Sequence, residues 1–475
     1  MPGVPSGRGC DGCRAQKKKC DQSKPSCGRC TRLKLVCVGS GERRYKFKDG
    51  FPTASKKQVL VAKSAPITTG LVRINGNTVN KTVPYTPTNE LSRMLSAFVD
   101  KINFSTTDYR YNLAWSFGGF LVDVPQRLGV NEALDASVAA VVVAHSDFSA
   151  RKGVTAHALM KYSRALNALR KYLDDPVKAN ASETLGAVMI LLICQQFIGG
   201  PERLWTGHCE GAAKMLKARR YYNPNDEFEA KIVLTLGGPV LFEGLLNPNI
   251  QFSPKEWKTL VQNHLNKDTH EGRFMYCLSR VPEFMQRIKA IRETGIGDST
   301  LLDDMRTNYD ALKAALSELY IQLQAVEKNM PDDSTPTTAK QARAFWAHNH
   351  LQRLYSLVLT IGIILNSVLS SIDAANAVEL AIETTQWSWE IIGIAEDAVR
   401  YRPLGACCLP LALAAAWVGG MYDPALRPLV EKWIIEYEND FPVGDKVDVN
   451  PRLLFEELLQ QCRLADVETP MVWTV

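Results

Sequence analysis

Six cysteines near the N-terminus form the clearest chemical pattern in the sequence. They follow the spacing C-x2-C-x6-C-x6-C-x2-C-x6-C, at Cys10, Cys13, Cys20, Cys27, Cys30 and Cys37. An even spread of the 12 cysteines over 475 residues would place only about 0.7 (28 × 12/475) in a window of this length. Two C-x2-C-x6-C units are offset by 17 residues, so the pattern is also an internal repeat. The clustering predicts a metal site with approximate two-fold symmetry.

The number of thiolates limits which metal arrangement can form. Structural zinc takes four tetrahedral ligands, so one zinc would leave two thiolates unused and two separate zincs would need eight. Six thiolates satisfy two Zn²⁺ ions if two sulfurs bridge. A disulfide framework is one alternative, but the opening MPGVPSGRGC lacks the apolar run of a secretory signal peptide, which favours a reducing compartment. Iron–sulfur ligation is another alternative, and its spacings differ.

The cysteine segment has few apolar side chains with which to build a core: Ala15, Leu33, Leu35 and Val36. These cannot offset the chain entropy of 28 residues. Metal binding, on the order of 10 to 16 kcal/mol for a structural zinc, must therefore supply the folding energy. We expect the metal-free segment to be unfolded.

The segment CDGCRAQKKKCDQSKPSCGRCTRLKLVC resembles the fungal Zn2Cys6 binuclear zinc cluster DNA-binding domain. The likeness covers all six cysteines and also Arg14, Lys17, Lys19, Asp21 and Pro25. It implies that the first and fourth cysteines, here Cys10 and Cys27, bridge two zinc ions. Cys13 and Cys20 would then complete one zinc site, and Cys30 and Cys37 the other. In the family the proline helps to turn the chain between the two halves.

The basic residues of this segment carry the predicted DNA contacts. Residues 14–20 predict about two turns of helix, and in the family this helix enters the major groove. The lysine four residues after the second cysteine, here Lys17, would read guanine N7 and O6 in CGG triplets, and Lys18 could reach the same bases or a phosphate. The predicted phosphate contacts are Arg14, Lys19, Arg29 and Lys34. The alternative is that the lysine run is a solvated face or a nuclear import signal.

Charge divides the chain into regions. Residues 1–89 hold 18 Lys and Arg against 4 Asp and Glu, a net of +14, so the total of +6 leaves −8 for residues 90–475. Residues 1–48 are predicted to be the DNA-binding domain with a basic extension, residues 49–89 a linker and residues 90–475 a regulatory domain. The family often dimerises through a coiled coil after the cluster, but residues 38–89 show no heptads. A homodimer is therefore left open.

From about Asn89 the hydrophobic periodicity is helical, which predicts an all-α domain. Helical patterns cover residues 155–173, 182–197, 202–219, 299–328, 339–372, 376–400, 406–419, 424–438 and 451–463, with Ser182 as an N-cap. The segments SETLGAVMILLICQQF and WTGHCEGAAKMLKARR resemble the fungal-specific transcription factor domain, a helical regulatory domain. The resemblance rests on Ser182, Glu183, Thr184 and Leu185, and on Trp205, His208, Gly211, Ala212 and Leu216. We expect His208 to be a hydrogen-bonded core histidine.

The body shows no pattern typical of an enzyme or a membrane anchor. No HExxH, G-x-S-x-G, P-loop or G-x-G-x-x-G motif is present, so an enzymatic activity is not expected. Residues 354–372 and 403–422 lack charged side chains, but their Ser, Asn, Pro and Gly content predicts buried core helices.

The sequence thus predicts a small zinc-stabilised module followed by a large all-α domain. The predicted function is a nuclear, sequence-specific regulator of transcription from RNA polymerase II promoters, whose partners are double-stranded DNA and the transcription machinery. The competing hypothesis is an interaction protein in which residues 1–37 bind RNA or protein without reading a DNA sequence.

Overall fold

A computed structural model describes residues 10, 12–13, 16, 18–23, 25–35, 37, 89–103, 108–199, 203–218, 226–247, 249–250, 252–260, 269–331, 336 and 338–441. The chain divides into two units, Met1–Thr82 and Val83–Val475. The division falls inside the predicted linker. The three-part domain organisation stays a prediction, because residues 38–88 lie outside the described part of the chain.

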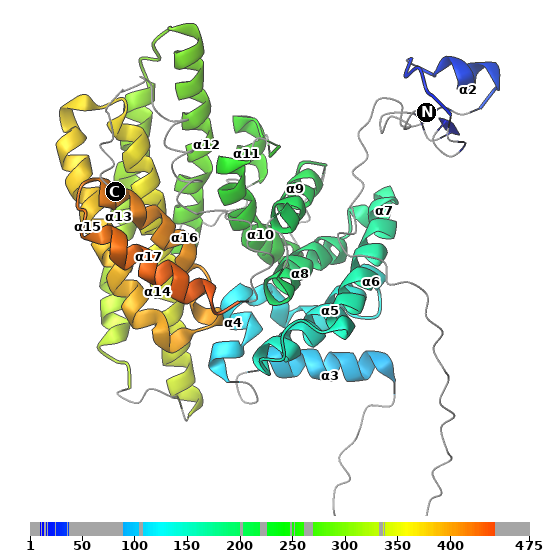
Figure 1. Ribbon diagram of the computed structural model, residues 1–475, viewed down its shortest axis with the longest axis horizontal. Helices are drawn as coiled ribbons and strands as arrows, with labels where there is room; N and C mark the ends of the chain where they lie inside the picture. Colours follow the sequence, from blue (N-terminus) through cyan, green and yellow to red (C-terminus); the bar gives the residue numbers. More distant parts are fainter. Residues whose placement is uncertain are drawn as a thin grey trace, which may run out of the picture. The chain divides into compact units, whose positions relative to one another are not determined.

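Among its described residues the N-terminal unit contains the short helix α2 (Gly28–Arg32), and Gly12 and Cys13 are also helical (Figure 1). The second unit is built from α-helices joined by short 3₁₀ turns, and we call it the helical body. Its helices are α3 (Glu90–Ile102), α4 (Leu113–Phe117), α5 (Glu132–Ser149), α6 (Ala156–Leu173), α7 (Pro176–Ala179), α8 (Ser182–Ile198), α9 (Arg203–Ala218), α10 (Glu227–Leu246), α11 (Pro254–Leu260), α12 (His270–Thr294), α13 (Leu301–Glu327), α14 (Ala339–Ser370), α15 (Ala377–Asp397), α16 (Leu409–Ala416) and α17 (Leu426–Glu438).

In the described part of the helical body the 3₁₀ turns are η1 (Tyr109–Tyr111), η2 (Gly119–Val122), η3 (Val124–Arg127), η5 (Ala374–Asn376), η6 (Ala398–Tyr401), η7 (Leu404–Ala406) and η8 (Trp417–Met421). No strand occurs in the part of the chain that the structure describes. The predicted all-α fold of the body is confirmed.

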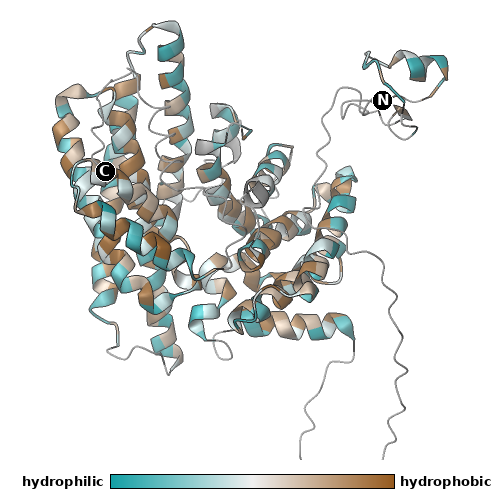
Figure 2. Ribbon diagram, in the orientation of Figure 1, coloured by the Kyte–Doolittle hydropathy of each residue, from teal (hydrophilic) through white to brown (hydrophobic). Residues whose placement is uncertain are grey.

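Helix α8 lies at the centre of the first half of the helical body. Helices α5, α6, α9 and α10 all pack against it. Every α8 residue except Glu183 and Gln196 is buried, which explains why this helix is apolar all round rather than amphipathic. Figure 2 shows the contrast with α6, on which hydrophobic and hydrophilic residues occupy different sides.

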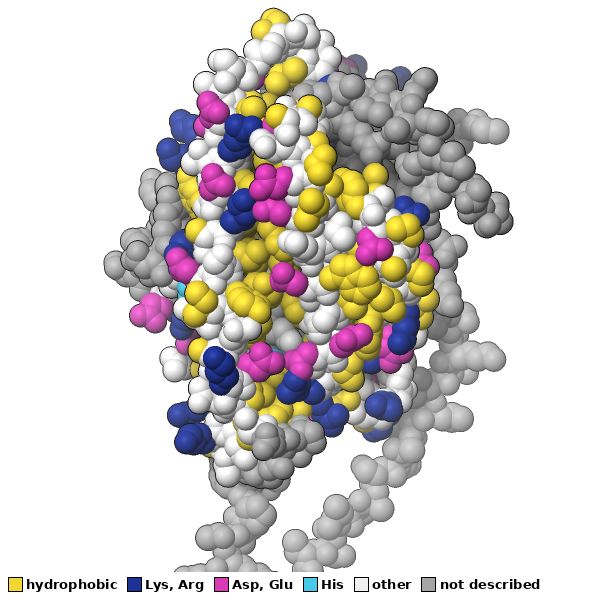
Figure 3. Space-filling view, turned by 90° about the vertical axis from the view of Figure 1, so that its left-hand side faces the viewer, with side chains coloured by type: hydrophobic (Ala, Val, Ile, Leu, Met, Phe, Trp, Pro, Cys, Tyr) yellow, Lys and Arg dark blue, Asp and Glu magenta, His cyan; other side chains and the backbone are white. Residues whose placement is uncertain are grey.

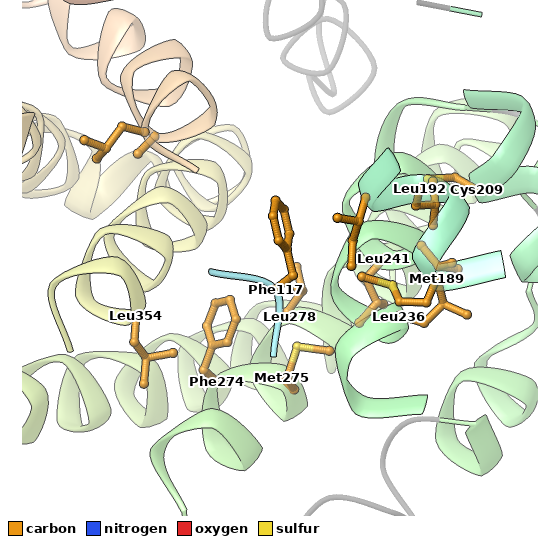
Figure 4. Packing of buried hydrophobic residues seen from close by; sticks show 14 of the residues in the cluster. Phe117, Met189, Leu192, Cys209, Leu236, Leu241, Phe274, Met275, Leu278 and Leu354 are labelled. Carbon is orange, nitrogen blue, oxygen red and sulfur yellow. The ribbon is translucent and has the colours of Figure 1, made fainter. Parts of the chain in front are cut away.

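The core continues from this half into the helices that follow. In Figure 4, Phe117 of α4 lies between side chains of α8 and α10 on one side and of α12 and α14 on the other. The side chains shown there are buried, including Leu192, Leu241 and Leu278. The α4 segment is also held from α14, because the Arg353 guanidinium donates to the carbonyl oxygens of Trp115 and Ser116 at 3.0 and 2.7 Å. One hydrophobic core therefore runs through the body.

The second half of the body pairs neighbouring helices in chain order. Helix α13 packs on α14, α14 on α15, α15 on α16 and α16 on α17. Two helical segments are long and apolar enough to cross a membrane, Ala339–Ser370 and Leu404–Met421, and their apolar windows are 78% and 72% buried inside the body. Burial of this extent fits the prediction that residues 354–372 and 403–422 form core helices.

The prediction for Ser182 is wrong. The N-cap of α8 is Ala181, and Ser182 is the first helical residue. The Ser182 hydroxyl instead donates to Asp226 Oδ2 at 2.9 Å, and Arg127 bridges Asp226 and Glu183 at 2.8 and 2.9 Å. The residues around Ser182 are typical of an N-cap, but Ser182 and Glu183 pair with residues that are distant in sequence.

The prediction for His208 is confirmed. Its imidazole is buried on α9, and Nε2 lies 2.6 Å from the hydroxyl of Tyr162 on α6. Leu185, Ala212 and Leu216 are buried as well. The Trp205 side chain and the predicted helix 451–463 lie outside the described residues.

Candidate zinc and nucleic-acid site

The six predicted cysteines come together in the N-terminal unit. Their sulfurs form two groups of four, and within each group all sulfurs lie within 4.8 Å of one another. The first group is Cys10, Cys13, Cys20 and Cys27, and the second is Cys10, Cys27, Cys30 and Cys37. Cys10 and Cys27 belong to both groups. Five of the six side chains are buried, and Cys37 is half-buried.

The sulfur spacing fits tetrahedral zinc. A Zn–S bond of about 2.3 Å places two tetrahedral ligands roughly 3.8 Å apart. The Sγ–Sγ distances are 3.6 Å for Cys10 and Cys27, 3.5 Å for Cys10 and Cys30, and 3.7 Å for Cys13 and Cys27. A disulfide would need about 2.05 Å, and all six cysteines are free. The donor set and its spacing are those of a thiolate zinc site.

The two repeats have the same hydrogen bonds 17 residues apart. The Cys10 N–H points at Cys20 Sγ at 3.5 Å, and the Cys27 N–H at Cys37 Sγ at 3.3 Å. The Lys18 N–H donates to the Cys13 carbonyl at 2.8 Å, and the Leu35 N–H to the Cys30 carbonyl at 2.9 Å. The internal repeat in the sequence is therefore a structural repeat.

The shared cysteines also have matching backbone environments. The Cys30 N–H donates to Cys27 Sγ at 3.4 Å. This contact lowers the pKa of the Cys27 thiol, and the Cys13 N–H lowers the pKa of Cys10 in the same way. Both sulfurs that belong to two groups are thus stabilised as thiolates, the form that binds metal.

The predicted two-turn helix over residues 14–20 is wrong for its described end. Gly12 and Cys13 are helical, Gln16 lies in a turn, and residues 18–20 are not helical. Two turns of helix would carry Cys20 about 10 Å along the axis from Cys13. Residues 18–20 are instead non-helical, and the Cys20 sulfur belongs to the same group as those of Cys10, Cys13 and Cys27.

The second repeat reverses at Lys34. This residue has φ +53°, a left-handed conformation that is uncommon for non-glycine residues. It follows α2, whose last carbonyls accept from the N–H groups of Leu33 and Lys34. The reversal directs Cys37 back toward Cys27, and it leaves the Lys34 side chain exposed.

Asp21 joins the two repeats. Its carboxylate accepts from the Gly28 N–H at 2.9 and 3.2 Å and from the Ser23 hydroxyl at 2.9 Å. These donors, the Gly28 N–H first, lower the pKa of Asp21. A Cβ on Gly28 would lie 2.9 Å from Asp21 Oδ2, so the close approach requires glycine. Asp21 therefore holds the first turn of α2, a position that favours negative charge.

The described basic residues occupy different environments. Lys18, Lys19 and Lys34 are exposed, and Arg29 is half-buried. The Arg29 guanidinium donates to Gln16 Oε1 of the other repeat at 2.5 Å, a tie between the repeats that the spacing does not reveal. Arg14 and Lys17 lie outside the described residues. The DNA contacts predicted for Arg14, Lys17, Lys18, Lys19, Arg29 and Lys34 stay predictions.

Comparison with known proteins identifies the class of this module. Residues 8–46 match the family model of the fungal Zn(2)-Cys(6) binuclear cluster domain. The N-terminal unit therefore contains a zinc-binding cluster domain of this family.

A curated relative agrees with that class. The chain is 45% identical over 49 residues to the protein named transcription factor dibT from Pestalotiopsis microspora. The alignment covers 10% of this chain and 8% of that protein, so the likeness is confined to a small part of each. No solved structure matches the chain. The helical body is thus characterised by its own fold alone.

Proposed function

We propose that this protein is a zinc-dependent, sequence-specific DNA-binding regulator of transcription that acts in the nucleus at RNA polymerase II promoters. The observation that carries the proposal is the pair of overlapping four-sulfur groups, with exposed lysines on the same small module. The match of residues 8–46 to the binuclear cluster family supports it. The helical body would be regulatory rather than enzymatic, and would meet the transcription machinery.

In this proposal two zinc ions share Cys10 and Cys27. Cys13 and Cys20 complete one ligand set, and Cys30 and Cys37 the other. Bound zinc supplies folding energy and charge compensation. The 28-residue segment has eight basic and two acidic side chains, so six thiolates and two Zn²⁺ leave a net charge of +4 (8 − 2 − 6 + 4). The cluster thereby stays cationic and attracts phosphate.

The basic side chains divide into two roles. Lys17 would read guanine in a CGG triplet through N7 and O6 in the major groove, with Lys18 beside it. Arg14, Lys19, Arg29 and Lys34 would contact phosphates and position the module. Two contacts favour a fixed position for the Arg29 charge, one with Gln16 and one with Cys13. Burial raises the pKa of Cys13 to about 12, and the contact with Arg29 partly offsets this rise.

Fluorescence anisotropy with the zinc-loaded full chain tests the proposal. The probes are a duplex with one CGG triplet and the same duplex with the triplet scrambled. We expect Lys17→Ala to weaken CGG binding by about 1 to 3 kcal/mol and to leave the scrambled duplex nearly unaffected. Lys19→Ala should weaken both equally and reduce the salt slope by about one.

The control variant is Lys289→Ala, which removes an exposed charge from α12 of the helical body. It should change neither affinity. Equal, salt-sensitive affinity of the wild-type chain for both duplexes would instead favour the interaction-protein hypothesis. Titration against single and paired triplets measures whether one or two chains bind.

A further inference from the structure

The outer face of helix α15 carries an exposed row of apolar side chains. Val378, Ile382 and Trp389 are 76%, 53% and 40% exposed. At 100° per residue the three positions lie within about 40° of one another around the helix, and the row is about 16 Å long. The opposite face of the same helix packs on α14 and α16. Solvated helix faces are normally polar, so this row needs a reason.

A row of glutamates follows the apolar row one residue behind. Glu379, Glu383 and Glu390 have the same spacing, and they lie roughly 100° from the apolar row around the helix. Helix α15 holds five acidic residues, the three glutamates with Glu396 and Asp397, and no Lys or Arg. The face therefore pairs a hydrophobic stripe with a negative edge.

Two of these glutamates are fixed by neighbouring helices. Glu383 accepts from the Tyr309 hydroxyl at 2.5 Å and from Lys313 Nζ at 3.3 Å, both on α13. Glu390 accepts from the Tyr355 hydroxyl of α14 at 2.5 Å. Glu379 makes no hydrogen bond or ion pair within the described part of the chain. Two of the three glutamates of this edge are thus held in place, and within the described part of the chain only Glu383 is paired with a cation.

Trp389 is held in place although its ring is partly exposed. Its indole N–H donates to Asp423 Oδ2 at 3.0 Å, which ties it to the segment after η8. Met421 in the same region is 39% exposed. A fixed, half-exposed tryptophan loses little conformational freedom on binding and is typical of interface hot spots. Figure 3 shows this side of the body, where hydrophobic side chains lie among Asp and Glu side chains.

We propose that the α15 face binds a cationic amphipathic helix of a partner protein. Apolar side chains spaced three, four or seven residues apart on the partner helix would cover Val378, Ile382 and Trp389. Flanking Lys or Arg residues of the partner would pair with Glu379 and Glu390. A second copy of this chain fits less well, because pairing α15 with itself would bring two lysine- and arginine-free acidic helices together. The proposal does not depend on how the zinc cluster reads DNA.

A designed peptide tests this site on the zinc-loaded full chain. The probe is a dye-labelled 18-residue Lys/Leu peptide with leucines at spacings of four and three along one face. A scrambled peptide of the same composition keeps the charge and removes the stripe. We expect the striped peptide to bind, and Ile382→Ser to weaken it by at least about fivefold, the effect of one hot-spot side chain. The separate variant Glu379→Gln should also weaken binding of the striped peptide, and it should reduce the salt dependence of that binding.

The matched control is Val177→Ser, which removes an apolar side chain that is 83% exposed on α7. It should not change binding, and both variants should melt within a few degrees of the wild type because the sites are exposed. Equal binding of the scrambled peptide, or equal loss in Val177→Ser, would overturn the proposal. So would a dimer in sedimentation velocity that Ile382→Ser dissociates, because the face would then belong to a second copy.

Discussion

Buried histidines make the stability of the helical body depend on pH. His208 lies against Tyr162, and burial lowers its pKa to about 4. Burial, and to a lesser extent Lys101, lowers the pKa of His145 to about 4 as well. His145 Nε2 lies 2.7 Å from the Tyr111 carbonyl, so Nε2 carries the proton and protonation at Nδ1 would place a charge in the core. Each histidine is therefore neutral in the folded chain.

The size of this pH dependence follows from the pKa of each histidine in the folded and in the unfolded chain. In the unfolded chain a histidine titrates near 6.5, so below that pH the unfolded state binds the extra proton and stability falls as pH falls. With a pKa of about 4 in the folded chain, one histidine lowers the free energy of unfolding by about 2 kcal/mol between pH 7.5 and pH 5. His208 and His145 together cost about 4 kcal/mol, a large part of the 5 to 15 kcal/mol typical of a domain. The loss stops growing below about pH 4.

The variant His208→Gln isolates one of the two contributions. Glutamine can keep a hydrogen bond to Tyr162 but cannot take up the proton, so the variant should lose about 1 kcal/mol at pH 7.5 through imperfect packing. Between pH 7.5 and 5 it should then lose about 2 kcal/mol less stability than the wild type.

Urea unfolding of the zinc-loaded full chain, followed by circular dichroism at four pH values, measures this difference. Subtracting the unfolding free energy of the variant from that of the wild type at each pH cancels the contribution of the carboxylates, which also titrate. His157→Gln on the exposed side of α6 is the control and should follow the wild-type profile. Parallel pH profiles for His208→Gln and the wild type would refute the reasoning.

Four further predictions concern packing and metal. In α14, Gly362→Ala would place a Cβ 2.7 Å from the Trp387 ring, so it should cost about 1 to 3 kcal/mol in urea unfolding. In α15, Gly393→Ala meets nothing within 4 Å and should stabilise by about 0.5 to 1 kcal/mol; a loss there would contradict the helix assignment. Chelation of zinc should abolish the DNA gel shift while the far-ultraviolet helical signal stays nearly unchanged, and added zinc should restore binding. Gly28→Ala should displace Asp21 and weaken zinc retention against a competing chelator; unchanged retention would argue against the Asp21 contact.

The cysteine site was predictable because its information is local. The internal repeat predicts one metal cluster, and ligand arithmetic predicts two shared sulfurs. The family resemblance implies that these are Cys10 and Cys27, which matches the two groups that share them. The path between the ligands was not predictable in the same way. The left-handed conformation of Lys34 and the hydrogen bond from Arg29 to Gln16 do not follow from the cysteine spacing, and only the folded unit reveals them.

In the helical body, hydrophobic periodicity predicts where the helices lie better than it predicts which residues contact one another. The predicted 339–372 and 424–438 correspond to Ala339–Ser370 and Leu426–Glu438. Helices α10 and α12 lie outside the predicted ranges, and each contains a proline, Pro239 or Pro282, a residue that normally signals a helix end. The error at Ser182 has a different cause: Asp226 and Arg127 are distant in sequence, and only the fold reveals that they meet it.

The two units are stabilised by different interactions, which decides how their functions can be separated. The cluster has few apolar side chains and depends on thiolate–metal bonds, whereas the body holds an extensive apolar core. Acid therefore cannot separate them, since protons compete with metal at the thiolates and also charge His145 and His208. Chelation acts on the cluster alone, and Gly362→Ala acts on the body alone. If the α15 face acts independently of DNA reading, chelation should abolish binding to CGG duplex and leave the affinity for the striped Lys/Leu peptide unchanged.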